Sequence, residues 1–171
     1  AEEALSESDL SLTDESVLSD EGNAFIAINS SKSNKAGNEL VLLQLSKGAS
    51  ALDYKRFDLK EYSVSDLHMM VDNANNNLIL CSYFADGKYS SPRGLFLCNY
   101  SIQQAALNGS YFTPLTLQIS STRKDLKDLK IRNMYLTKSG HVEIATEKYT
   151  QTVRNITSPA PLMSSSYMMS N

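Results

Sequence analysis

The stretch Leu67–Phe84 reads LHMMVDNANNNLILCSYF and is the strongest structural signal in the chain. Two β-prone apolar runs flank the Asn- and Asp-rich segment 72–77, which predicts two antiparallel strands joined by a tight turn. The same order of apolar run, polar turn and apolar run recurs around segments 19–23 and 137–141. Hairpins that recur at long intervals predict a repeated architecture.

The spacing of the three hairpins suggests the size of the repeat. The strands that follow the turns begin at Ala24, Leu78 and Val142, so the intervals are 54 and 64 residues. The common propeller repeats are shorter, at roughly 40–50 residues, yet each interval here has room for the four short strands of a propeller blade. We therefore predict a mostly β fold of β-propeller-like, repeated antiparallel blades in an incomplete ring, with a compact β-sandwich as the alternative.

Two further predictions concern single elements. Leu78–Phe84 and Gly94–Tyr100 should be antiparallel neighbours, because the loop 85–93 between them contains Gly and Pro. The segment Ser121–Lys130 is the best helix candidate, since its two leucines lie three residues apart and a Ser or Thr could cap it.

Composition divides the chain into three segments. Residues 1–22 carry eight acidic side chains and no basic one, which predicts an acidic, partly disordered leader. Residues 23–149 hold the repeated antiparallel β units. Residues 150–171 are rich in Ser, Pro and Met, which predicts an irregular tail.

Charge and spacing argue against several function classes. The formal net charge of −3 provides no attraction to nucleic acid or anionic membranes, and no apolar run approaches the about 18 residues of a transmembrane span. His68 and His141 are far apart and accompany no spaced Cys or His pair, so we expect neither a metal site nor a cofactor. The sequence offers no set of nucleophile, base and orienting group, so we expect no enzymatic activity.

Two pairs of reactive residue types receive structural interpretations. Cys81 and Cys98 lie in predicted partner strands, where we expect buried free thiols; a disulfide is the alternative. Glu143 and Glu147 lie four residues apart in one predicted strand and should share its solvated face, so we expect exposed acids in place of a glycosidase pair.

The tyrosines supply the candidate binding residues. Tyrosine is good contact material for proteins and sugars, although it is also common at strand edges. Several tyrosines gather around the predicted loops of the second unit, together with an arginine. The candidate binding residues are Tyr83, Tyr89, Arg93, Tyr100 and Tyr111.

Three stretches of the sequence resemble one protein family. They are Asp66–Phe84, Gly94–Leu97 and Leu136–Tyr149, the last with a turn, a strand and a Glu-x-Tyr ending. In them the sequence resembles the large, mostly uncharacterised β-propeller-like proteins that bacteria of the Bacteroidota phylum export to the cell envelope. The resemblance lies within residues 66–149, about half of the chain. One departure is that the second turn lacks a clear Gly.

The resemblance implies a non-enzymatic interaction module, exported to the periplasm or cell surface, that binds protein partners through its loops. A carbohydrate-binding or carbohydrate-active β domain that uses the tyrosine-bearing loops is the alternative. Members of the family continue through several more blades. We therefore expect residues 1–171 to need the remaining part of a longer chain, or a protein partner, to cover the open faces of the blades.

Overall fold

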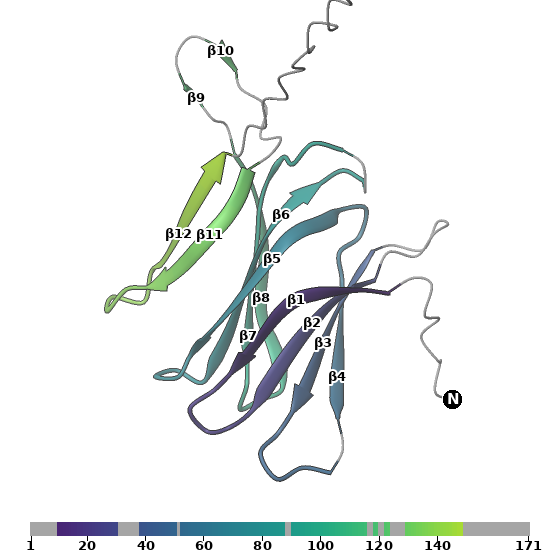
Figure 1. Ribbon diagram of the computed structural model, residues 1–171, viewed down its shortest axis with the longest axis vertical. Coiled ribbons are helices and arrows are strands. Elements are labelled where there is room, and N and C mark those ends of the chain that lie inside the picture. The colour runs from purple at the N-terminus through teal and green to yellow at the C-terminus, as the bar shows by residue number, and fades with distance from the viewer. Residues whose placement is uncertain are drawn as a thin grey trace, which may run out of the picture.

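The fold is mostly β and antiparallel (Figure 1). The computed structural model describes residues 10–30, 38–50, 52–87, 90–115, 118–119, 122–123 and 129–148, and the secondary structure of these residues is strand and turn. The predicted β fold is therefore confirmed, and the stacking of its sheets fits a compact sandwich-like arrangement.

The first sheet is a meander of four consecutive strands in the order β1-β2-β3-β4. Its strands are β1 (Leu10–Leu18), β2 (Ala24–Ser30), β3 (Glu39–Leu45) and β4 (Asp53–Asp58). Residues 10–18 fall within the segment that we expected to be an acidic leader, so β1 corrects that boundary, while residues 1–9 lie outside the described residues.

The second sheet repeats this order as β5-β6-β7-β8. Its strands are β5 (Ser63–Asp72), β6 (Asn77–Ala85), β7 (Gly94–Ser101) and β8 (Ala106–Pro114). β6 and β7 pair antiparallel from Asn77↔Ser101 to Phe84↔Gly94, which confirms the predicted pair.

A third unit begins in the same way. β11 (Leu129–Leu136) and β12 (Val142–Lys148) form an antiparallel hairpin, preceded by a two-residue pair, β9 (Gln118–Ile119) and β10 (Thr122–Arg123). The predicted helix Ser121–Lys130 is wrong at both described ends, which are strand; residues 121 and 124–128 lie outside the described residues, as does the predicted tail.

The three predicted hairpin turns share one backbone feature. Gly22, Asn76 and Gly140 each have a positive φ, of 88°, 51° and 82°, two residues before Ala24, Leu78 and Val142. Asn tolerates this left-handed conformation better than other residues that carry a Cβ atom. In the second turn, Asp72 also accepts hydrogen bonds from the backbone and side chain of Asn75, at 3.2 and 2.7 Å. Asn76 therefore takes the place of the Gly that the second turn lacks.

The two central strands of the second sheet, β6 and β7, are covered on both faces. One face packs on the first sheet in a core that includes Phe25, Leu42, Leu80 and Phe96, while the other packs against Ile131 and its neighbours on the β11–β12 hairpin. β6 is consequently buried on both sides from Leu78 to Ala85. Each fully buried side chain of this size contributes about 1.5–3 kcal/mol of hydrophobic stabilisation, so these two interfaces hold the units together.

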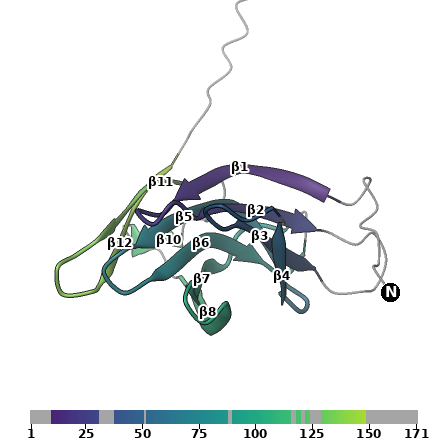
Figure 2. The same cartoon turned by 90° about the horizontal axis from the view of Figure 1, so that it is seen from below.

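The opening strands of the three units lie next to one another. β5 contacts both β1 and β11 (Figure 2). Each of these strands also contains an irregularity against its hairpin partner, between Leu12 and Ser16, Ser65 and His68, and Ile131 and Asn133. Bulges of this kind twist a strand and redirect its side chains, and here they lie where the units meet.

Candidate functional site

The five predicted binding residues do not form one surface. Tyr83 and Tyr100 are 1% and 0% exposed, and they belong to different apolar clusters on opposite faces of the second sheet. Tyr111 on β8 is 63% exposed, and Arg93 is exposed and forms an ion pair with Asp86 at 2.6 Å. Tyr89 lies outside the described residues. Tyr83 and Tyr100 are thus core residues, which corrects their place in the predicted binding surface.

Strand register explains where the two buried tyrosines lie. Tyr83 on β6 pairs with Leu95, whereas Tyr100 on β7 pairs with Leu78, and paired residues share a face of the sheet. The same register separates Cys81, which pairs with Leu97, from Cys98, which pairs with Leu80. Both cysteines are buried and free, as predicted, because their side chains point to opposite faces of the sheet.

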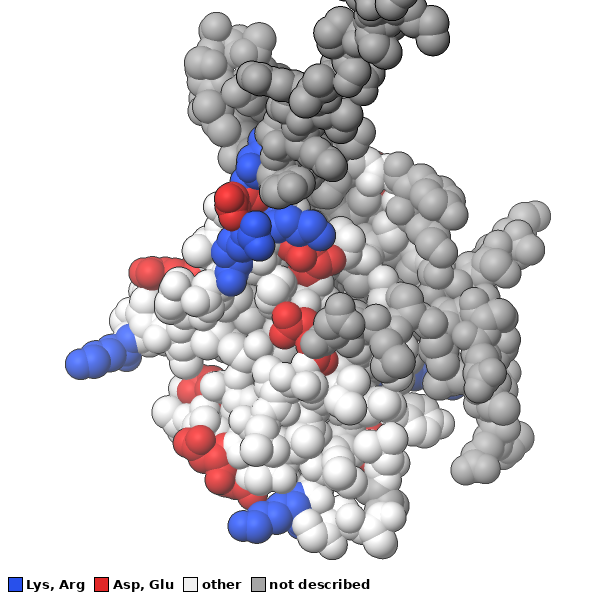
Figure 3. Space-filling model, in the orientation of Figure 1, with Lys and Arg blue, Asp and Glu red and all other residues white. Residues whose placement is uncertain are grey.

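Acidic side chains, a histidine and a lysine connect the three opening strands. His68 on β5 lies with Nδ1 3.1 Å from the Glu15 carboxylate on β1 and with Nε2 3.7 Å from Asp66 on its own strand. Asp66 is also 3.7 Å from Lys130 Nζ on β11. We call these four residues the opening-strand charge line. Acidic and basic side chains gather on the face where β11 approaches β5 (Figure 3).

The bulge in β5 positions Asp66 for this role. Asp66 has a positive φ of 55°, and its carboxylate accepts the backbone N–H of Ile131 on β11. Ser82 donates its hydroxyl at 2.6 Å to the backbone carbonyl of Ser65, beside the bulge. The unusual backbone at Asp66 thus allows one side chain to bind the backbone and the lysine of the next unit.

A cysteine lies beside His68, and a cysteine next to a histidine can form a nucleophilic site. Cys81 is the register partner of His68, and Asp66 lies close to both. However, Cys81 is fully buried, and burial together with the Asp66 charge raises the pKa of its thiol to about 12. A nucleophilic cysteine needs a lowered pKa and an accessible sulfur, so this arrangement holds a protonated, structural thiol.

The other histidine lies in an exposed turn. His141 Nδ1 is 3.1 Å from the Ser139 hydroxyl, and the backbone N–H of His141 donates to the Thr137 hydroxyl. These two hydrogen bonds stabilise the turn between β11 and β12. No ion pair joins His141 to a described carboxylate. Within the described ranges, no group of three or more His, Cys, Asp or Glu side chains could hold a metal ion.

Glu143 and Glu147 are both exposed on β12, as the sequence predicts. Glu147 forms an ion pair at 2.6 Å with Arg132 on β11. The pairing partner of Glu143 in the register is Tyr135, which is also exposed. The two glutamates therefore belong to a solvated strand face, where a cross-strand ion pair of this kind contributes at most about 1 kcal/mol.

The turns β1–β2, β3–β4, β5–β6 and β7–β8 lie together at one end of the two sheets (Figure 1). The backbone N–H of Asp20 in the first turn donates to Asn73 of the second sheet at 3.0 Å, and that of Lys47 donates to Asn23 at 3.3 Å. Four exposed leucines flank these turns: Leu18, Leu45, Leu52 and Leu107. We call this surface the turn end. The sequence did not reveal these leucines as surface residues, because they lie at or beside strand ends, where an apolar residue looks like a core residue.

Within the described part of the chain, no helix has the length and hydrophobicity needed to cross a membrane. Comparison with protein-family models, with curated proteins and with solved structures finds no match to this chain.

Proposed function

We propose that the chain is a non-enzymatic, β-propeller-like interaction module of the bacterial cell envelope that binds a protein partner at its turn end. The observation that carries this proposal is the repeated unit. Two four-stranded meanders and the start of a third stack in chain order, with their opening strands side by side. Propeller blades are four-stranded sheets arranged around a centre, so this order favours a propeller over an unrelated sandwich.

The turn end is the surface with the composition of a protein-binding site. Leu18 is 68% exposed and Leu45 is 44% exposed, and both lie beside turns that contact one another or their neighbours through hydrogen bonds. Exposed apolar side chains that lie close together, within polar surroundings, favour contact with another protein. Leu18 and Leu45 are the last residues of β1 and β3, so the sheet holds both side chains beside the turns.

Glycan binding, the alternative function, has less support. Two of the tyrosines that it would use, Tyr83 and Tyr100, are buried in the core. The exposed Tyr111 lies over its own strand, because a Cβ atom added to Gly109 would approach its ring at 3.2 Å. Of the described candidate tyrosines, two are therefore inaccessible to a sugar, and the ring of the third lies against its own strand.

Site-specific photo-crosslinking tests the proposed function. A photoreactive amino acid in place of Lys47, in the turn between β3 and β4, should crosslink one envelope protein in the native bacterium. The double change Leu18→Ser and Leu45→Ser should abolish that adduct. The change Tyr135→Ser, which removes an exposed apolar residue from the β11–β12 hairpin, is the matched control and should leave it intact. An adduct insensitive to the leucines, or no protein adduct, would reject a turn-end partner.

A further inference from the structure

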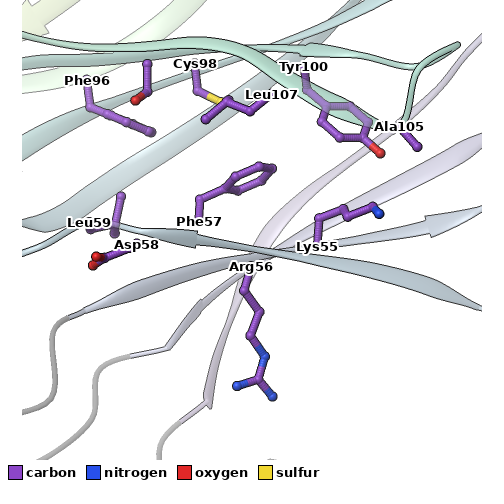
Figure 4. Close-up of a pocket in the computed structure, with 11 residues that line it drawn as sticks. Lys55, Arg56, Phe57, Asp58, Leu59, Phe96, Cys98, Tyr100, Ala105 and Leu107 are labelled. Atoms are coloured by element: carbon purple, nitrogen blue, oxygen red, sulfur yellow. The ribbon is translucent and has the colours of Figure 1, made fainter.

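A pocket of about 410 Å³ opens between the two sheets, on the side of β4 and β8 (Figure 4). β4 is the last strand of the first sheet, and it faces β7 and β8 of the second across this space. Phe57 and Lys55 on β4 point toward β7 and β8, whereas Arg56 points away (Figure 4). The volume lies within the roughly 300–1,000 Å³ of typical small-molecule sites.

The inner part of the pocket is apolar. Phe57 meets the ring of Tyr100 edge-on, with centroids 6.2 Å apart, and Phe96 and Cys98 lie behind them on β7. Burial raises the pKa of the Cys98 thiol to about 12, so this sulfur acts as an apolar, uncharged group. Tyr100 directs its hydroxyl at Gln44, to which it donates at 3.1 Å, and presents its ring to the pocket.

A turn with a left-handed residue lines one end of the pocket. Ala105 lines the pocket and has a positive φ of 49°. A left-handed conformation costs a non-glycine residue about 1–2 kcal/mol. This turn and the adjacent irregularity between Asn99 and Tyr100 set the path of β8, which brings Leu107 and Ser110 to the rim.

The rim of the pocket carries charged side chains of both signs. Lys55 makes no ion pair or hydrogen bond with any described residue. The Asp58 carboxylate, beside Leu59 at the other side of the pocket in Figure 4, already accepts the backbone N–H of Lys60 at 2.7 Å. Arg56 lies near Glu39 at 3.7 Å. Among the described residues that line the pocket, Lys55 is thus the cation without a described partner, and the Ser110 hydroxyl offers a second donor.

The geometry points to a binding site for a small amphipathic carboxylate, whose hydrocarbon or aromatic body lies between Phe57 and β7–β8 and whose carboxylate binds Lys55. This inference goes beyond the proposed function and does not depend on it, because the residues that recognise the ligand belong to the inter-sheet pocket. An apolar body with a single anionic group matches a pocket that is apolar inside and whose described lining places Lys55 at the rim.

Displacement of a fluorescent probe tests the site. The probe is 8-anilinonaphthalene-1-sulfonate, and the competitors are 3-phenylpropionate and the matching neutral alcohol, 3-phenylpropanol. We expect one saturable probe site, displaced by the carboxylate. Lys55→Gln should weaken the carboxylate about tenfold, the usual effect of losing one charge-assisted hydrogen bond, and leave the alcohol unchanged. Lys138→Gln, in the turn of the third unit, is the charge-matched control.

A second pair of variants separates the pocket from other apolar surfaces. Ser110→Trp places an indole ring at the rim and should abolish displacement of the probe by 3-phenylpropionate. Thr113→Trp places the same ring on the opposite face of β8 and should not. Thermal melts establish that each variant is folded, and the exposed Lys55 keeps the test decisive if Ser110→Trp does not fold. Failure of the carboxylate to displace the probe, or equal displacement in Lys55→Gln and wild type, would overturn the site.

Discussion

Removal of two buried hydroxyl groups should change the stability of the protein in opposite directions. The Tyr83 hydroxyl is buried and has no hydrogen-bond partner among the described residues, although Thr146 lies near enough to oppose the rise in the Tyr83 pKa that burial causes. The Tyr100 hydroxyl, in contrast, donates to Gln44 Oε1 at 3.1 Å. The substitutions Tyr83→Phe and Tyr100→Phe keep both rings in place and remove only the oxygen atoms.

The expected magnitudes follow from these environments. An unpaired buried polar group costs about 1–3 kcal/mol, and the void left by its removal offsets part of the gain, so Tyr83→Phe should stabilise the protein by about 1 kcal/mol. A neutral hydrogen bond contributes about 1 kcal/mol, so Tyr100→Phe should destabilise the protein by about that amount. The free energies of unfolding of the two variants should therefore differ by about 2 kcal/mol.

Urea denaturation followed by circular dichroism measures this difference. Equal slopes of the unfolding free energy against urea for both variants and wild type would show that the substitutions act on the folded state. A loss of stability in Tyr83→Phe as large as that in Tyr100→Phe would mean that the Tyr83 hydroxyl has a strong partner after all. The substitution Thr146→Val provides the control. It should leave the free energy of unfolding nearly unchanged if Thr146 makes no hydrogen bond to the Tyr83 hydroxyl.

Three further predictions concern the core, the bulge and the thiols. Leu80→Ala, in the fully buried core between the sheets, should lower the free energy of unfolding by about 2–5 kcal/mol. Leu52→Ala, at an exposed position, should change it by less than about 0.5 kcal/mol. Urea denaturation measures both changes. Asp66→Ala should cost about 2 kcal/mol more than Asp66→Asn, because Asn still accepts the Ile131 N–H and tolerates the left-handed backbone; similar losses in both variants would contradict this role. Burial raises the pKa of the Cys81 and Cys98 thiols from 9.0 to about 12. Their contribution to stability is therefore complete below pH 9 and declines as the pH rises toward 12. Replacement of both cysteines by Ala should flatten this decline, measured by urea denaturation between pH 9 and 12.

Local turn chemistry made the hairpins predictable from sequence. The segment 72–77 contains the Asp and Asn side chains that form its turn, and the two hydrogen bonds between Asp72 and Asn75 join residues only three positions apart. The strand pair of β6 and β7 was predictable for the same reason, because a short loop with Gly and Pro joins two apolar runs. These features depend on neighbours a few residues away, which the sequence displays directly.

Burial on both faces of the second sheet explains the errors. An interpretation of Tyr83 and Tyr100 as surface residues assumes one solvated face, but β6 is apolar at nearly every position, the pattern of a strand buried on both sides. That continuous pattern was the available signal for the burial of Tyr83. The predicted helix at Ser121–Lys130 failed at Leu129, because pairing with Lys148 and packing beside Ile131 favour a strand over the local helical spacing.

The opening-strand charge line could not be predicted from sequence. Its members come from β1, β5 and β11 and meet only because the three units stack. The pocket between the sheets is equally non-local, since Lys55 and Ser110 line it from two separate meanders. Neither residue belongs to a recognisable motif, and only the packing of the sheets gives them a common role.

The coverage of the second sheet on both faces has a consequence for the order in which the chain acquires structure during translation. The first sheet leaves the ribosome before the surface that covers it exists, so Phe25, Leu42 and the rest of its inner face wait for β5–β8. At about 5–20 residues per second, synthesis of that second sheet takes several seconds. During this interval the nascent chain presents an apolar sheet face to the surrounding solution, which is the kind of surface that chaperones bind. The second sheet has no comparable delay on that side, because its partner is already complete when its own strands emerge.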